Sequence, residues 1–246
     1  MNNPFTLSGK TILVTGASAG IGRGIAIACA GMGAQVILTA RNTERLQDTL
    51  AMLEGKGHTC IVADLTKEKE RTTLVEQLPM LDGVVQCAGV GSRVPCKMLT
   101  QDDLDHVMKT NAEAPMLLQA QLLSEKKIKK QASLVYIASA AATMPSSGNA
   151  VYSASKAAMI AYAKCLAQEL APRQIRVNCI SPTMVWTDLA LVGATVEQLQ
   201  EAQQLYPLKR YGQPEDIANL AIYLLSDASA WMTGSNIEIT GGTQML

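Results

Sequence analysis

The sequence predicts an α/β protein built on a doubly wound parallel sheet of about seven strands, with helices on both faces. Short apolar segments alternate with longer amphipathic segments along the 246 residues, which is the pattern of repeated βα units. Several apolar segments lack polar alternation, as strands covered on both faces do. A glycine-rich turn at residues 16–22 also joins the first predicted strand directly to a helix.

Seven apolar segments have the length of strands: Thr11–Thr15, Gln35–Ala40, Thr59–Ala63, Gly83–Cys87, Ser133–Ser139, Arg176–Ile180 and Asn236–Ile239. Apolar residues at helical spacing follow most of them. The first helix carries Ile21, Ile25, Ala28, Cys29 and Met32 on one face, and the later helices are predicted over Thr43–Lys56, Glu68–Leu78, Gln101–Met108, Ala112–Lys127, Val151–Leu170 and Pro214–Leu225. Because no linker or internal repeat divides the chain, we expect one domain over residues 1–246.

Two segments need separate interpretation. The stretch Thr183–Gln213 contains apolar residues without a strand pattern, and we expect one or two short helices that form a lid over a binding site. An irregular packed connection is the alternative. The basic run Lys126–Lys130 is predicted to end the helix before the strand that begins near Ser133, since cations favour helix C-termini.

Composition excludes several classes of function. The 21 basic and 21 acidic residues give a formal net charge of zero, so no general field attracts nucleic acid or an anionic membrane. No run approaches the ~20 apolar residues of a membrane span. The six cysteines form no Cys-x-x-Cys pair, and the first residues lack the pattern of a signal peptide. We expect a cytoplasmic protein with reduced thiols and no metal site.

The glycine-rich turn predicts a Rossmann-like phosphate site. Its sequence is Thr15-Gly-Ala-Ser-Ala-Gly-Ile-Gly22. Gly16 allows a tight turn after the strand, while Gly20 and Gly22 permit close approach of backbone and diphosphate. The following helix N-terminus offers free N–H groups to phosphate oxygens. We therefore expect cofactor contacts from Gly16, Ser18, Ala19, Gly20, Ile21 and Gly22.

The end of the second strand favours NADP(H) over NAD(H). A site for NAD(H) places a carboxylate here, on the ribose 2′-hydroxyl, but this chain has Ala40 and Arg41. A guanidinium binds a 2′-phosphate through charge-assisted hydrogen bonds. Asp64, after the third strand, is a candidate acceptor for the adenine amino group. NAD(H) remains the alternative cofactor, with Arg41 then only a surface residue.

Tyr152 and Lys156 are predicted to share one face of a helix, four residues apart. An ammonium beside a phenol favours the phenolate, which makes proton exchange near neutral pH easier. Ser139 ends the fifth predicted strand, and ligands of doubly wound sheets bind beyond the carboxyl ends of strands. Asn111 lies at a predicted interruption of a helix and can join these groups.

With these residues the chain resembles the short-chain dehydrogenase/reductase family over essentially its whole length. The matching residues are the glycine turn, Asp64, Ala88, Gly89, Asn111, Ser139, Tyr152, Lys156, Ser181 and Pro182. The resemblance implies that Tyr152 is the general acid, Lys156 its partner on the cofactor ribose, Ser139 the ligand of the substrate oxygen and Asn111 the holder of a water. It also implies cofactor contacts from Leu65, Ala88, Gly89, Pro182, Val185 and Thr187.

Two positions depart from the family pattern. Cys87 stands where the family usually has Asn, and Thr183 stands where it favours Gly. Cys87 is interpreted as a small apolar filler rather than a redox switch. Thr183 either crowds the nicotinamide or adds a hydroxyl near it.

The sequence therefore predicts an NADP(H)-dependent carbonyl reductase, closest in appearance to 3-oxoacyl acyl-carrier-protein reductases. A 3-oxoacyl thioester is the first expected substrate, and a sugar, polyol or steroid alcohol is the alternative. A non-catalytic NADP(H) sensor on the same fold is the rival function. Apolar residues around much of Val151–Leu170 also predict a homotetramer or homodimer.

Overall fold

The computed structural model describes residues 3–192 and 194–243. One parallel sheet in the order β3-β2-β1-β4-β5-β6-β7 forms the centre of the described chain, which confirms the predicted fold class. The strands are β1 Thr11–Thr15, β2 Gln35–Ala40, β3 Thr59–Val62, β4 Leu81–Gln86, β5 Ile128–Ile137, β6 Arg176–Pro182 and β7 Asn236–Ile239. The strand order reverses between β1 and β4, where a doubly wound sheet forms its ligand crevice.

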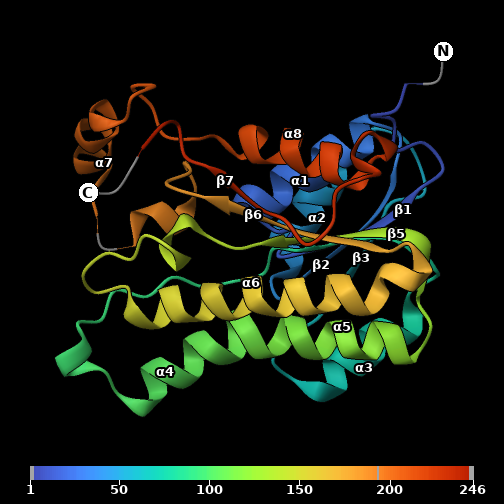
Figure 1. The fold of residues 1–246 in the computed structure, drawn as a ribbon, viewed down its shortest axis with the longest axis horizontal. Helices are drawn as coiled ribbons and strands as arrows, with labels where there is room; N and C mark the ends of the chain where they lie inside the picture. The colour runs from blue at the N-terminus through green and yellow to red at the C-terminus, as the bar shows by residue number, and fades with distance from the viewer. Residues whose placement is uncertain (1–2, 193, 244–246) are drawn as a thin grey trace.

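Helices form a layer on each side of this sheet. Their bounds are α1 Gly20–Gly31, α2 Thr43–Ala51, α3 Glu68–Gln77, α4 Gln101–Met108, α5 Ala114–Ser124, α6 Ala150–Leu170, α7 Val196–Ala202 and α8 Pro214–Leu225. Figure 1 shows α1, α2 and α8 above the sheet and α3 to α6 below it. No helix in residues 3–192 or 194–243 is both long enough and apolar enough to span a bilayer.

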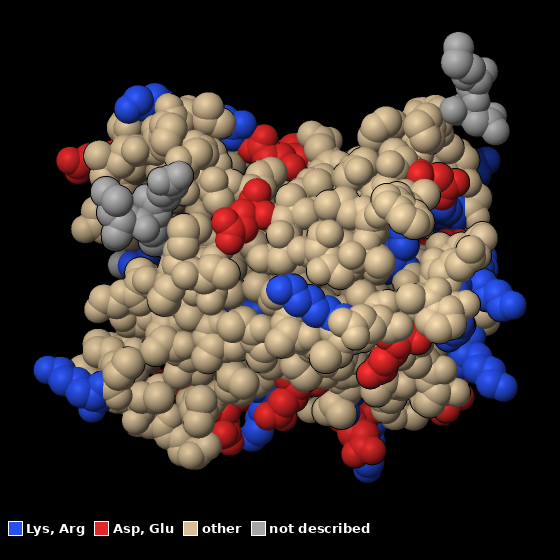
Figure 2. Space-filling view, in the orientation of Figure 1, with Lys and Arg blue, Asp and Glu red and all other residues tan. Residues whose placement is uncertain are grey.

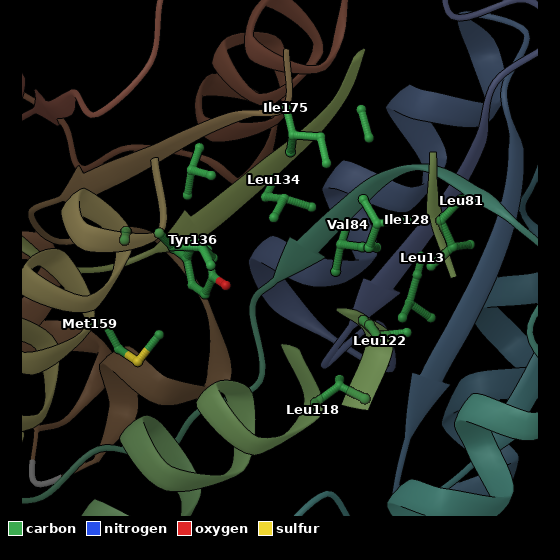
Figure 3. Packing of buried hydrophobic residues seen from close by; sticks show 14 of the residues in the cluster. Leu13, Leu81, Val84, Leu118, Leu122, Ile128, Leu134, Tyr136, Met159 and Ile175 are labelled. Carbon is green, nitrogen blue, oxygen red and sulfur yellow. The ribbon is translucent and has the colours of Figure 1, made fainter. Parts of the chain in front are cut away.

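The two layers bury two separate apolar cores. Leu13 of β1, Val84 of β4 and Leu134 of β5 face Leu118 and Leu122 of α5 and lie in one cluster (Figure 3). On the opposite face, residues of α1, α2 and α8 pack against the alternate side chains of the same strands. Because strand side chains alternate between faces, each central strand contributes to both cores, and the crevice between β1 and β4 has rigid walls.

The prediction that Lys126–Lys130 ends a helix was wrong. α5 ends at Ser124, and Ile128 already pairs with Leu81 as the first residue of β5. A bulge hides this start, since the register shifts between Leu81 and Gly83 and Gln131 has a φ of +64°. Lys127 instead donates to the carbonyl of Leu78, at 2.6 Å, just after α3. Lys126 and Lys127 therefore precede β5, while Lys129 and Lys130 lie inside it and isolate its first apolar residue, Ile128, in the sequence.

Other predicted boundaries differ by a few residues. α2 ends at Ala51 rather than Lys56, since Gly55 and Gly57 adopt positive φ values before β3. The predicted interruption at Asn111 is confirmed, because residues 109–113 form a short π-helical segment between α4 and α5. Such segments are frequent at functional sites.

Within 183–192 and 194–213, the described residues contribute no strand to the sheet. They form a 3₁₀ turn at Asp188–Leu191, the short helix α7 and a further turn at Gln203–Leu205. Ala190, Leu199 and Tyr211 make a small apolar cluster of their own. The predicted helical content is present here, and the function of the segment as a lid remains a proposal.

Replacing Ile128 tests the corrected start of β5. Ile128 is fully buried in the core, so Ile128→Ala should lower the free energy of unfolding by about 2 to 5 kcal/mol. The matched control Lys130→Ala changes an exposed residue of the same strand and should shift it by no more than about 0.5 kcal/mol. Urea denaturation measures both. Equal stability of the two variants would contradict this boundary.

Candidate active site

A cavity of about 740 Å³ lies at the carboxyl ends of the strands. It runs from the turn after β1, past the ends of β4 and β5, to the first turns of α6 and residues 182–192. Its walls include every residue predicted to contact a cofactor: Gly16, Ser18, Ala19, Gly20, Ile21, Gly22, Arg41, Asp64, Leu65, Ala88, Gly89, Tyr152, Lys156, Pro182, Val185 and Thr187. Ser139 also lines it, while Asn111 lies behind its wall.

The glycine turn has the geometry of a phosphate cradle. Gly16 and Gly20 have φ values of +66° and +51°, which glycine adopts at little cost. A methyl group on Gly16 would lie 2.8 Å from the Cα of Ala88, and one on Gly22 would lie 2.3 Å from the carbonyl oxygen of Gly16. These contacts leave room only for hydrogen. They hold the backbone turn against the end of β4 and the start of α1.

The N-terminus of α1 is open to an anion. Ala19 is its N-cap and supplies no side-chain hydrogen bond, and no acidic residue occupies the first turn of this described helix. Arg23 fixes the turn from behind by donating to the carbonyl of Ser18, at 2.6 Å. The free N–H groups and the helix dipole therefore favour a phosphate in this part of the cavity. The structure thus fits a dinucleotide at this point.

The far end of the cavity carries the two groups predicted for the adenosine part of the cofactor. Arg41 follows β2 and Asp64 follows β3, and both line the wall. Burial would raise the pKa of Asp64, but hydrogen bonds from Thr66 and the charges of Arg41 and Lys67 hold that pKa below its usual value. Asp64 is therefore ionised at neutral pH and can accept hydrogen bonds.

Tyr152, Lys156 and Ser139 all line this cavity. The ammonium of Lys156 lies 5.8 Å from the centre of the Tyr152 ring. Lys156 is 6% exposed, and it donates to the carbonyl of Ile137, at 2.9 Å. Ser139 Oγ accepts from the N–H of Ala141, at 3.1 Å, which leaves its hydroxyl hydrogen available for another partner.

Asn111 fastens the loop after β4. Its Oδ1 accepts from the N–H of Val90, at 2.8 Å, and its Nδ2 donates to the carbonyl of Val90, at 2.9 Å, and to Ser155 Oγ, at 3.1 Å. A methyl group on Gly89 would lie 3.2 Å from Asn111 Oδ1 and 3.5 Å from Lys156 Nζ. Both N–H groups of the side-chain amide are used, so a water held by Asn111 would contact Oδ1, which accepts one of the two hydrogen bonds it can take, or the backbone.

The two unusual residues fit without distortion. The N–H groups of Cys87 and Ala88 both donate to Thr15 Oγ1, at 3.0 and 3.1 Å, so the backbone is held without help from a side-chain amide. Burial raises the pKa of the Cys87 thiol to about 12, although Lys156 acts in the opposite direction. Cys87 is therefore a neutral thiol, as a filler would be. Thr183 Oγ1 donates to the carbonyl of Thr240, at 3.2 Å.

Sequence reasoning missed several residues that line the cavity. Arg45, in the first turn of α2, forms an ion pair with Asp188 of the segment predicted as a lid. Arg93 and Asn149 lie at the other end. The second arginine four residues after Arg41, in the predicted helix Thr43–Lys56, was a usable signal. Arg93 had none, because its loop has no regular pattern.

Comparison with known proteins identifies the family. A family model described as Enoyl-(Acyl carrier protein) reductase matches residues 16–244. L-xylulose reductase of Caenorhabditis elegans is 34% identical, with 97% of each chain covered. The 3-oxoacyl acyl-carrier-protein reductase FabG of Rickettsia felis is 33% identical, with 98% of this chain and 99% of that protein covered.

Solved structures with a similar fold point to the same family. A short-chain type dehydrogenase/reductase of Mycobacterium marinum has a TM-score of 0.88 at 32% identity, with 97% of each chain covered. A Beutenbergia cavernae structure with NADP bound at low occupancy has a TM-score of 0.88 at 31% identity, with 98% of each covered. This chain belongs to the short-chain dehydrogenase/reductase family. It is an oxidoreductase that acts on alcohol and carbonyl groups with NAD(P)(H).

Adding a methyl group to Gly16 tests the cradle. Gly16→Ala meets a positive φ and the backbone of Ala88, so it should destabilise the protein by about 1 to 3 kcal/mol and weaken NADPH binding. The control Gly31→Ala lies at the exposed end of α1 with nothing near its added methyl group. It should keep both properties or gain up to about 1 kcal/mol. Urea denaturation measures the stability of both variants, and titration measures their affinity for NADPH. A Gly16→Ala variant with unchanged stability and NADPH affinity would refute the cradle.

Proposed function

We propose that this protein is an NADP(H)-dependent carbonyl reductase that converts a ketone to a secondary alcohol, with Tyr152 as the general acid. The observation that carries this proposal is the position of Tyr152, Lys156 and Ser139 on the wall of the same cavity as the glycine turn. Bound NADPH would supply the hydride. Residues of this chain would then have to stabilise the carbonyl oxygen, donate the proton and hold the cofactor in place.

The proposed roles follow from the surroundings of each side chain. Ser139 would donate its free hydroxyl hydrogen to the carbonyl oxygen, where negative charge develops during reduction. Tyr152 would give its phenolic proton to that oxygen as the new C–H bond forms. Lys156, beside the Tyr152 ring, would stabilise the resulting phenolate and bind the ribose of the cofactor. Asn111 would hold a water that returns a proton to this group from solvent.

Preference for NADP(H) is part of the proposal. Arg41 lines the cavity at the end of β2, where an NAD(H) site needs a carboxylate. The nearest wall carboxylate, Asp64, comes from the next strand. The NADP bound in the Beutenbergia cavernae relative is consistent with this preference. NAD(H) is the alternative cofactor.

The relatives of this chain suggest more than one class of substrate. A 3-oxoacyl thioester is suggested by the Rickettsia felis relative, and a sugar or polyol by L-xylulose reductase. A steroid alcohol remains a further alternative. We propose that the segment 183–213 forms the substrate lid, since Met184, Leu189 and Val192 line the cavity.

A cytoplasmic homotetramer, or a homodimer, completes the proposal. Ala154, Ala157 and Ala161 of α6 and Leu117 of α5 are exposed in the single chain. Residues other than Lys, Arg, Asp and Glu make up most of the molecular face that Figure 2 shows. Exposed apolar residues along neighbouring helices favour burial against another subunit.

Turnover tests the general acid. Purified protein with NADPH and a panel of ketones should oxidise NADPH, and Tyr152→Phe should lower kcat by about 10²- to 10⁴-fold with NADPH affinity unchanged. Tyr162→Phe removes a hydroxyl from the same helix outside the cavity and should keep nearly full activity. NADPH binding without turnover of any ketone would instead support a sensor. An active Tyr152→Phe would remove the assigned role.

Cofactor titration tests Arg41. In Arg41→Ala the affinity for NADPH should fall by about 10- to 100-fold, because a charge-assisted contact is lost. NADH lacks the 2′-phosphate and serves as the internal control, so its affinity should stay within about twofold. Fluorescence titration of each reduced cofactor gives the ratio. An unchanged ratio of the two affinities would rule out the contact.

A further inference from the structure

The charges on the cavity wall are unevenly distributed. Among described residues, the carboxylates that line it are Asp64 and Asp188, while the cations are Arg41, Arg45, Arg93 and Lys156. Asp64 lies near Arg41, and Asp188 pairs with Arg45. Both carboxylates thus lie at the end of the cavity that carries Arg41, where each is close to an arginine. The end that carries Tyr152 has two cations and, along the described wall, no carboxylate.

Backbone contacts tie the loop that carries Arg93 to the segment that precedes Tyr152. The N–H of Val94 donates to the carbonyl of Gly148, at 2.9 Å. Gly148 precedes Tyr152 by four residues, so chain length limits their Cα separation to about 14 Å. The loop that carries Arg93 is fastened at Val90 by the side chain of Asn111. Arg93 therefore has a defined position relative to the reacting group.

The lid segment partly covers this loop. A methyl group on Gly91 would lie 3.0 Å from Leu189 Cδ1, so the two segments are in contact. Burial raises the pKa of Tyr211, and the nearby Arg93 guanidinium opposes that rise, which indicates that the guanidinium reaches toward the lid. Arg93 itself is exposed, so its guanidinium stays open to a group that enters the cavity.

Arg93 lacks a protein counter-ion. It takes part in none of the ion pairs between residues 3–192 and 194–243. A guanidinium offers a planar pair of donors that fits carboxylate and phosphate oxygens. The polar side chains of Ser146 and Asn149 also line this end. Arg93, Ser146 and Asn149 therefore offer hydrogen-bond donors on the cavity wall.

We propose that Arg93 is a specificity residue that binds a carboxylate or phosphate of the substrate, so that the enzyme acts on small anionic ketones. The inference rests on the proposed carbonyl reductase function. The reaction is unchanged: hydride adds to the carbonyl carbon and a proton to its oxygen, while the anionic group stays intact. A 3-oxoacyl thioester carries a neutral group beside the ketone and would leave Arg93 unpaired.

Matched substrate pairs test the inference. The probes are 4-oxopentanoate with its methyl ester, dihydroxyacetone phosphate with dihydroxyacetone, and acetoacetyl N-acetylcysteamine as the neutral thioester. The wild-type kcat/KM should be at least about tenfold higher for one anionic member than for its neutral partner. The pair that shows the difference tells carboxylate from phosphate.

Variants then assign the preference to Arg93. Arg93→Ala should lower kcat/KM for the anionic member by about 10- to 100-fold, mainly through KM, with the neutral partner within about threefold. Arg93→Lys should recover part of the loss. Lys97→Ala changes an exposed cation of the same segment that does not line the cavity and should match wild type.

The outcomes separate the two proposals. Turnover of neutral ketones or of the thioester without preference for an anion, or a preference that survives in Arg93→Ala, overturns the role of Arg93 and leaves carbonyl reduction standing. Failure to reduce any of the five probes or other ketones overturns both. Loss of turnover of neutral and anionic substrates alike in Arg93→Ala would show a structural role and also overturn the inference.

Discussion

The site depends on one buried hydroxyl. Thr15, fully buried at the end of β1, accepts hydrogen bonds from the N–H groups of Cys87 and Ala88 just past β4. These strands are neighbours where the strand order reverses, so the contact sets the width of the crevice. It also brings Ala88 against Gly16, where only a hydrogen atom fits. The glycine turn and the cavity wall formed after β4 are therefore held together by the same contacts, which we call the Thr15 joint.

A second joint continues from the first. Asn111 binds both backbone groups of Val90 and also reaches Ser155 of α6. Because Asn111 sits in a π-helical segment between α4 and α5, its side chain points across the layer rather than along the helix. The loop after β4 is thus fixed at two points, Thr15 and Asn111. Lys156 Nζ lies close to Gly89 of this loop, and a nearly buried ammonium is tolerable only with hydrogen-bond partners such as the carbonyl of Ile137.

Most of this arrangement was accessible from the sequence, and the exceptions have physical causes. Strand and helix periodicity predicts the sheet, and the glycine turn predicts its own strained geometry. The start of β5 escaped because a bulge at Gln131 separates Ile128 from the rest of the strand and charges surround it. Arg93 escaped because its position is set by hydrogen bonds to distant backbone, at Gly148, rather than by local periodicity. That the backbone at Cys87 is held by Thr15 Oγ1 was also not visible in the sequence, because this contact joins residues 72 positions apart.

The same contacts explain why specificity and chemistry can vary separately. The side chains proposed to react stand on strands and helices that belong to the two main cores, and moving those elements would disrupt buried packing. The segment 183–213 instead has its own small cluster around Leu199 and Tyr211, and such peripheral units open at lower free energy than the core does. Its ion pair from Asp188 to Arg45 and the contact of Leu189 with Gly91 reach both ends of the cavity. Substitutions in this segment would therefore reshape the substrate end while the Thr15 joint keeps proton donor and phosphate turn in register.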